Sequence, residues 1–146
     1  MRVLRVTAKT YAHATEDPGR VARALLNVLP EDLRGKARIR EQRFKGHYGN
    51  PIRLMEVLID EPEEASLAWE WILSNLDDLD RRHLLATLEE RVDDNGTLYI
   101  RLDKQEAFHG SLRILEGDDV VRVSVKFRGG KRRVIDGLAR ELGARG

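Results

Sequence analysis

A tight turn followed by strict alternation of polar and apolar residues, at residues 95–103, constrains the fold of this chain more than any other stretch. Asn95-Gly96 is a dipeptide typical of turns. The residues after it alternate between polar and apolar side chains, Thr97-Leu-Tyr-Ile-Arg-Leu-Asp103. A period of two indicates a strand that buries one face and leaves the other in water. The wet face offers an aromatic ring and a guanidinium, which suit a polyanion with flat bases better than a covalent reaction.

Similar patterns along the rest of the chain set the expected fold class. Alternating or apolar runs predict strands at residues 2–13, 36–45, 52–60, 97–102, 111–115 and 120–127. Apolar residues at three- and four-residue spacing predict helices that begin near Pro18 and Pro62 and that span residues 77–92 and 132–142. Because the strands come in groups, the sequence predicts an α+β fold with a mixed or antiparallel sheet and helices packed mainly on one face. The other face of the sheet would then be wet.

Length and composition favour one soluble domain. A chain of 146 residues fits a single domain over residues 1–146. No apolar run approaches the roughly 20 residues of a membrane-spanning helix, and the N-terminal residues alternate like a strand rather than forming the apolar block of a signal peptide. With no cysteine, disulfides and thiolate metal sites are excluded. We therefore expect a cytoplasmic protein with no membrane contact.

The net charge of +1 hides segments of opposite sign. Residues 1–59 hold 12 Lys and Arg against 6 Asp and Glu, whereas residues 60–95 hold 3 against 12. Residues 126–146 are again basic, with 7 against 2. A basic side is what a phosphate backbone selects. Chance runs on a highly charged surface are the alternative explanation.

The wet faces of the predicted strands carry cations interleaved with rings. They contribute Arg38, Arg40, Phe44, Tyr99, Arg101, Arg122, Lys126 and Arg128. Cationic grooves with stacking rings hold single-stranded nucleic acid, and this composition fits that mode. A solvated sheet face with ordinary cross-strand ion pairs is the alternative.

Two further segments are candidates for contact with nucleic acid. The loop Lys45-Gly-His-Tyr-Gly-Asn-Pro51 presents His47, Tyr48 and Asn50 between or beside glycines, which allow close approach of a ligand. Lys131-Arg-Arg133 begins the last helix, where a phosphate would meet cations and backbone amides together. A loop packed back on the sheet and a flexible basic tail are the respective alternatives.

Enzyme functions have less support in the sequence. The 4 histidines are scattered, with no spacing typical of zinc sites. The acidic clusters at residues 77–80 and 89–94 are more typical of solvated helix ends than of a magnesium site, although a magnesium-dependent nuclease remains an alternative. No P-loop, nucleophile-elbow or dinucleotide-binding motif is present. We therefore expect no catalysis, no cofactor and no metal.

Two longer motifs, Gly46-His-Tyr-Gly-Asn-Pro-Ile52 and Arg101-Leu-Asp-Lys-Gln-Glu-Ala107, add a resemblance that covers nearly the whole chain. Together with His13-Ala-Thr-Glu-Asp17 they resemble a small archaeal RNA-binding family described as predicted exosome subunits. The resemblance implies a fold similar to ribosomal protein L5, RNA as a partner, and a role in RNA processing or degradation beside the exosome or other RNA-processing proteins. The resemblance implies that the RNA-binding residues include His47, Tyr48, Asn50, Arg101, Lys104 and Gln105. Phe108 stands where the family often has tyrosine, so stacking is kept and a hydroxyl is lost.

These observations together predict a non-catalytic RNA-binding protein. The cations expected to hold phosphates are Arg101, Lys104, Lys126, Arg128, Lys131, Arg132 and Arg133. The rings expected to stack on bases are Tyr48, Tyr99 and Phe108. The side chains expected to form directed hydrogen bonds are His47, Asn50 and Gln105. The alternative is a protein-interaction subunit that presents its acidic helices, residues 60–95, to a basic partner, and the sequence leaves a homodimer open.

Overall fold

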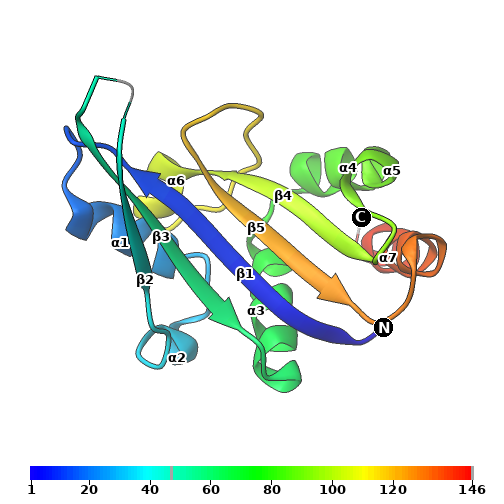
Figure 1. The fold of residues 1–146 in the computed structure, drawn as a ribbon. Helices are drawn as coiled ribbons and strands as arrows, with labels where there is room; N and C mark the ends of the chain where they lie inside the picture. Colours follow the sequence, from blue (N-terminus) through cyan, green and yellow to red (C-terminus); the bar gives the residue numbers. More distant parts are fainter. Residues whose placement is uncertain (47, 146) are drawn as a thin grey trace.

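The computed structural model describes residues 1–46 and 48–145, and it contains one five-stranded sheet in the order β2-β3-β1-β5-β4 (Figure 1). The strands are β1 (Val3–Ala12), β2 (Arg40–Lys45), β3 (Pro51–Ile59), β4 (Thr97–Asp103) and β5 (Val120–Phe127). Every neighbouring pair is antiparallel. The predicted α+β fold with an antiparallel sheet is therefore confirmed.

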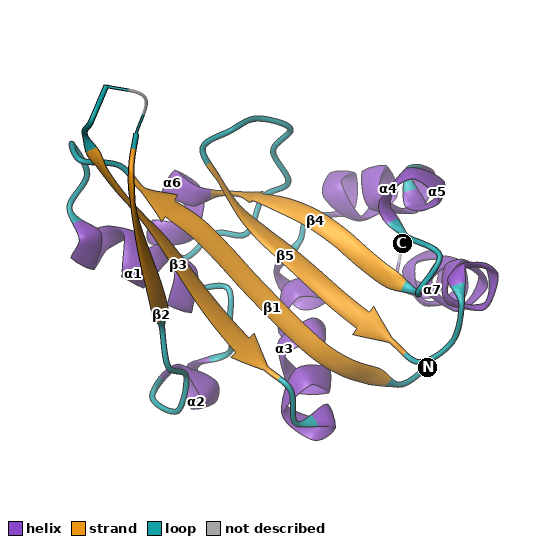
Figure 2. Cartoon of the chain, viewed as in Figure 1, coloured by secondary structure: helices purple, strands orange, loops and turns teal. Residues whose placement is uncertain are grey.

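Helices lie behind the sheet in the view of Figure 2, and α4, α5 and α7 gather beyond β4. The helices are α1 (Pro18–Leu26), α2 (Glu31–Arg34), α3 (Pro62–Asn75), α4 (Asp78–Ala86), α5 (Leu88–Arg91), α6 (Lys104–Phe108) and α7 (Lys131–Arg145). In the described part of the chain, no helix crosses the near face of the sheet. We call this uncovered surface the open face. None of the helices described here has both the length and the apolar character needed to cross a membrane.

The buried core lies between the sheet and the helices and follows the alternation of the strands. Val6 and Ala8 of β1 are buried, as are Ile100 of β4 and Val123 of β5. Trp69 of α3 packs edge-on against Phe127 with ring centroids 5.5 Å apart. Because one face of each strand is committed to this core, the polar residues between the apolar ones must lie on the open face.

Side-chain caps explain where the main helices begin. The Asp17 carboxylate accepts a hydrogen bond from the Gly19 amide at 3.0 Å, and Pro18 occupies the first turn. Asp77 caps α4 in the same way by accepting from the Asp80 amide at 2.8 Å. Acidic caps satisfy amides that a helix start leaves unpaired and complement its dipole. The predicted helix starts therefore have a local physical cause.

Three predicted elements differ from the structure. The helix predicted over residues 77–92 divides at Thr87, whose hydroxyl donates to the carbonyl of His83 at 2.8 Å, into α4 and α5. The strand predicted at residues 36–45 begins only at Arg40. The strand predicted at residues 111–115 is wrong, because only an isolated bridge joins Leu102 to Ile114. The Ile114 amide instead donates to the Asp80 carboxylate at 2.9 Å, which diverts a backbone donor from strand pairing.

The polar run after β4 forms a short helix that the sequence pattern does not predict. The Asp103 carboxylate accepts hydrogen bonds from the amides of Gln105 and Glu106, at 2.9 and 3.1 Å, and so begins α6 directly at the end of β4. Before β4, Gly96 has a φ of 81° and completes the predicted Asn-Gly turn. Few residues other than glycine adopt this conformation.

Candidate nucleic-acid interface

Strand register places three cations side by side on the open face. Lys9 of β1 lies directly opposite Arg122 of β5, and Arg122 lies directly opposite Arg101 of β4. We call these three residues the cation row. Across β1 the row continues to Glu56 of β3, which in turn lies opposite Arg40 of β2. A line of side chains that crosses the whole sheet therefore holds four cations and one carboxylate.

The cation row is not neutralised by acidic side chains. Among the described residues, neither Lys9 nor Arg122 forms an ion pair, and the Arg101 guanidinium donates only to the carbonyl of Gly117, at 3.3 Å. Like charges that lie directly opposite on neighbouring strands destabilise a sheet. The row thus costs folding free energy, and it leaves three positive charges available to an anion.

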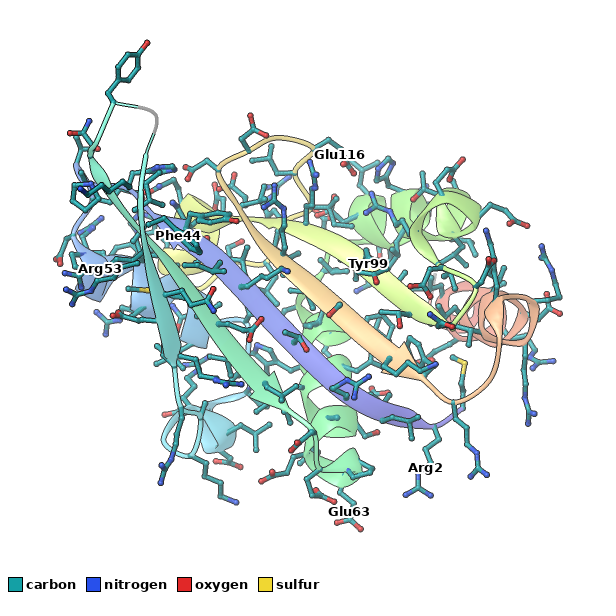
Figure 3. The ribbon with its side chains drawn as sticks, in the orientation of Figure 1. Arg2, Phe44, Arg53, Glu63, Tyr99 and Glu116 are labelled. Carbon is teal, nitrogen blue, oxygen red and sulfur yellow. The ribbon has the colours of Figure 1, made fainter. Side chains whose placement is uncertain are left out.

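Aromatic rings flank the cation row. Tyr99 lies two residues before Arg101 on β4 and is 51% exposed, and Tyr11 lies two residues after Lys9 on β1 and is 39% exposed. Phe44, on the edge strand β2, is 48% exposed, and Figure 3 shows Phe44 and Tyr99 over opposite edges of the sheet. A shallow hollow of about 380 Å³ joins the row to Tyr99, and the side chains of Thr7 and Ser124 also line it. Cations and exposed rings are therefore combined on one surface.

A carboxylate at the start of β4 holds the Tyr99 ring in place. The Tyr99 hydroxyl donates to Asp93 at 3.0 Å, and Asp93 also accepts from the backbone amides of Thr97 and Asn95. The amide of Thr97, followed by the hydroxyl of Tyr99 and the amide of Asn95, lowers the pKa of Asp93 below its usual range. The same contact raises the pKa of Tyr99. Asp93 therefore stays ionised and Tyr99 protonated, so their hydrogen bond persists across the neutral range.

The wet-face residues Tyr99, Arg101, Arg122 and Lys126, all predicted from sequence, meet on the open face. Lys126 lies between Arg5 of β1 and Thr97 of β4, and its ammonium donates to the carbonyl of Asn95. Arg128 follows the end of β5, where its side chain is exposed and its backbone amide donates to the carbonyl of Arg2 at 2.9 Å. These cations extend the basic surface from the cation row toward the N-terminal end of β1.

Lys104 does not belong to this surface, and its burial disfavours the predicted contact with a phosphate. Only 3% of its surface is exposed. Its ammonium donates to the carbonyl of Tyr11 at 3.0 Å and pairs with Glu16 and Asp119, each at 2.8 Å. All three of its protons are thereby used inside the protein. Burial by itself raises the pKa of Asp119, but Lys104 and Gln105 bring it below its usual range.

The other α6 candidates lie on the helical side of the molecule. The side-chain amide of Gln105 donates to Asp119 at 3.0 Å. Phe108 is partly buried, with the Arg20 guanidinium 3.9 Å from its ring centroid and the centroid of the His109 ring 5.0 Å away in an edge-on arrangement. Because a cation already covers one face of the Phe108 ring, this ring is less available to a base than Tyr99.

The β2–β3 loop projects from the end of the sheet that carries Phe44 (Figure 1). The Gly46 amide donates to the carbonyl of Asn50 at 2.6 Å, which closes the loop. Tyr48 is 88% exposed and Asn50 is exposed. His47 lies outside the described residues. The loop belongs to the edge opposite Tyr99 and Arg101, because β2 and β4 are the two edges of the sheet.

The basic start of α7 is partly neutralised by α5. Lys131 and Arg132 both pair with the Glu89 carboxylate, and the hydrogen bond from Arg132 lowers the pKa of Glu89. Arg133 is exposed and makes no ion pair among the described residues. Two of the three cations predicted to hold phosphates here therefore already have an anionic partner.

Lys9 and Tyr11 are missing from the residues predicted from sequence, although they contribute to the open face. The alternation at residues 2–13 is the signal that places them there, with Val6 and Ala8 on the buried side. That signal does not give the register of β1 against β5. Without the register, Lys9 cannot be recognised as the neighbour of Arg122.

Comparisons with known proteins relate the chain to a described family and to solved structures. Residues 5–127 match a protein family described as RNA binding. An RNA-binding protein of Pyrococcus abyssi is 36% identical over 124 residues, which cover 84% of this chain and 80% of that protein. A solved DUF54 protein of Archaeoglobus fulgidus is 31% identical with a TM-score of 0.81, covering 96% of this chain and 99% of the other. A second solved DUF54 protein, from Methanothermobacter thermautotrophicus, is 26% identical with a TM-score of 0.78 and covers 97% and 98%. The chain therefore belongs to this RNA-binding family.

Proposed function

We propose that this protein binds RNA through its open face and catalyses no reaction of its own. The observation that carries the proposal is the cation row, in which Arg122 lies directly opposite both Lys9 and Arg101, and none of the three forms an ion pair among the described residues. Adjacent strands are about 4.8 Å apart, so the row presents closely spaced positive charges to a backbone of phosphates. Membership of an RNA-binding family supports RNA as the polyanion.

We further propose that the chain acts as one domain, in the cytoplasm, as an accessory factor in archaeal RNA processing or degradation associated with the exosome. The resemblance of the motifs at residues 46–52 and 101–107 to predicted exosome subunits supports this setting. The arrangement of helices on one side of an antiparallel sheet supports a fold of the ribosomal protein L5 type. Copurification with exosome subunits from an archaeal lysate, resistant to ribonuclease treatment, would test the association.

A second candidate function rests on the acidic helices. Residues 60–95 carry a large excess of Asp and Glu, and many of these side chains, such as Glu63, Asp78 and Glu90, are exposed on α3, α4 and α5. A surface of this charge suits a basic protein partner. In that case the protein would be an interaction subunit of an RNA-processing or ribosome-related complex, with little affinity for RNA itself.

The deciding experiment is a titration of the purified protein with structured and single-stranded RNA, at low and moderate salt, with and without magnesium. RNA binding that weakens with salt, with the RNA left intact, is the expected result because phosphate contacts release counterions. The absence of binding at low salt would favour the acidic interaction surface. Cleavage of the RNA only when magnesium is present would overturn the non-catalytic part of the proposal. Sedimentation of the same samples would decide whether the protein forms a homodimer.

A further inference from the structure

We infer that the RNA held on the open face is single-stranded, that its backbone follows the cation row across the sheet strands, and that its bases stack on Tyr99 on one flank and on Tyr11 on the other. This inference rests on the proposed RNA-binding function and specifies the form of the RNA. It also assigns Asp93 as the positioning residue for Tyr99.

The geometry of the cation row determines the direction in which the RNA backbone crosses the sheet. Lys9, Arg122 and Arg101 lie on three neighbouring strands, β1, β5 and β4, so they span about 10 Å at right angles to the strand direction. Beyond Glu56, Arg40 extends the line to the β2 edge, over about 19 Å in total. A backbone that runs along this line has a cation at four of five positions, whereas one that runs along the open side of β5 meets Arg122 and Lys126 with the uncharged Ser124 between them. The line has room for roughly four nucleotides, the lower end of the range for small single-strand-binding folds.

The rings of Tyr99 and Tyr11 lie where the bases of an RNA on this path would be. Since β1 and β4 are both antiparallel to β5, they run in the same direction. Tyr99 precedes Arg101 by two residues and Tyr11 follows Lys9 by two, so the rings stand about 7 Å from the row on opposite flanks. Each ring is exposed by more than a third, at 51% and 39%. Bases that splay to either side of the backbone could therefore stack on a ring on both flanks.

The hydrogen bond between Tyr99 and Asp93 gives a reason for the presence of a carboxylate beside a basic surface. A carboxylate there weakens the attraction of phosphates, but Asp93 binds the Tyr99 hydroxyl and two amides of the turn before β4. The ring is thus fixed before RNA arrives. A ring that is already ordered loses less conformational entropy on binding than a mobile one.

A duplex does not fit this arrangement. Its base faces are stacked inside the helix, so Tyr99 and Tyr11 would have no partner. Proteins that recognise double-stranded RNA contact phosphates and 2′-hydroxyls across grooves over about 16 base pairs. The open face instead offers one short line of cations between two rings.

The test compares one labelled ten-nucleotide RNA of mixed sequence, alone and annealed to its complement, by fluorescence anisotropy at low salt. We expect the single strand to bind at least tenfold more tightly than the duplex. Tyr99→Ala should weaken single-strand binding about tenfold, which is the effect of losing one stacked base. Tyr99→Phe keeps the ring and loses only the hydrogen bond to Asp93, so it should weaken binding by about twofold.

A tryptophan at position 99 reports stacking by its fluorescence, which would not respond to RNA if the Tyr99 ring only stabilised the fold. In Tyr99→Trp, the added indole fluorescence should be quenched by the single strand, beyond any change of Trp69 and Trp71 in the parent protein. Tyr48→Ala tests the competing location, because it removes the exposed ring that the sequence predicts to stack on a base from the β2–β3 loop. A loss of affinity in Tyr48→Ala but not in Tyr99→Ala would overturn the path across the sheet.

Different binding results would overturn the single-stranded inference and the proposed RNA-binding function. Equal affinity for single strand and duplex, together with an unaffected Tyr99→Ala variant, would overturn the single-stranded inference and leave RNA binding intact. Binding of neither RNA at low salt would overturn both.

Discussion

Two lysines show how the same residue type serves opposite purposes in this protein. Lys9 projects from the open face, whereas Lys104 is buried and holds β1, the approach to α1 and the approach to β5 together through Tyr11, Glu16 and Asp119. A buried charge is tolerated when its hydrogen bonds are complete, and it becomes costly when one partner is removed. The contribution of a lysine to RNA binding therefore depends on its exposure and not on the motif in which it stands.

Lys104→Met should destabilise the protein by roughly 1–3 kcal/mol, because the Tyr11 carbonyl would lose its buried donor and the partly exposed Glu16 and Asp119 would lose their cation. The affinity of the remaining folded protein for RNA should be unchanged. Lys9→Met is the matched variant and should show the reverse pattern, with normal stability and weaker binding. Urea unfolding and RNA titration of both variants measure the two effects. A folded Lys104→Met protein with reduced affinity would return Lys104 to the interface.

Asp93 should make the stability of the protein depend on pH in acid. Hydrogen bonds from the Thr97 amide and the Tyr99 hydroxyl lower the pKa of Asp93, whose ordinary value is 3.8. A lowered folded-state pKa means that this stabilisation is complete above pH 3.8 and is lost as pH falls through the lower, folded value. Asp93→Asn should flatten the pH dependence of the unfolding free energy in that window. Asp94→Asn, which removes the same charge but no hydrogen bond to the turn, is the control, and an equal flattening there would contradict this account.

At the scale of elements, the three strands β1, β5 and β4 combine a well-packed buried face with an open face that carries unfavourable charges. Val6, Val123 and Ile100 bury the inner side, while Lys9, Arg122 and Arg101 repel one another on the outer side. Proteins retain such local costs mainly at functional sites. The sheet therefore gives up some stability for its binding surface.

Arg122→Thr should raise the free energy of unfolding by roughly 0.2–1 kcal/mol, because it removes the central charge of the row and places a good strand former on β5. The same substitution should weaken RNA binding. Ser124→Thr lies on the same face of β5 and controls for the strand preference of threonine. Denaturant unfolding and RNA titration give both quantities, and a destabilised Arg122→Thr protein would show that the row is not under electrostatic strain.

The sequence predicts elements better than it predicts the neighbours of each residue. The alternation at Thr97–Asp103 is local, so it identifies β4 and its wet side. If the same alternation is continued past Leu102, it places Lys104 on the buried side. The polar residues that follow Asp103 nevertheless suggest a solvent-exposed turn. The start of α6 depends on the Asp103 cap, and the failure of a strand at residues 111–115 depends on the distant carboxylate of Asp80. The cation row depends on pairing between strands far apart in the chain, which no local pattern reports.

At the scale of the whole molecule, the cation row and the acidic segment occupy different parts of the surface. The open face carries the cation row, whereas residues 60–95 form α3 behind the sheet and α4 and α5 beyond β4 (Figure 1). Lys131 and Arg132 share the single carboxylate of Glu89, which cancels one of their two charges. A net charge near zero is therefore compatible with strong local attraction for RNA.

The salt dependence of binding should report the size of the interface. If the three cations of the row each neutralise one phosphate of a single strand, log K should fall with log salt concentration at a slope of roughly −2. Replacing Lys131 and Arg132 by glutamine should leave this slope unchanged, because the proposed path of the RNA crosses the sheet and does not include α7. A slope near zero would exclude the row as a phosphate site, and a slope that falls in the Lys131/Arg132 variant would extend the interface to α7.

The measurement that tests the central claim most directly is the RNA affinity of two double variants with the same change of net charge. Lys9→Gln with Arg122→Gln removes two of the three charges of the row, whereas Arg23→Gln with Arg82→Gln removes two exposed cations from helices α1 and α4. Binding of one single-stranded RNA at low salt should fall at least tenfold in the first variant and by less than about twofold in the second. An equal loss in both variants would mean that RNA responds only to net charge, and an unchanged affinity in the first would mean that RNA does not bind the open face.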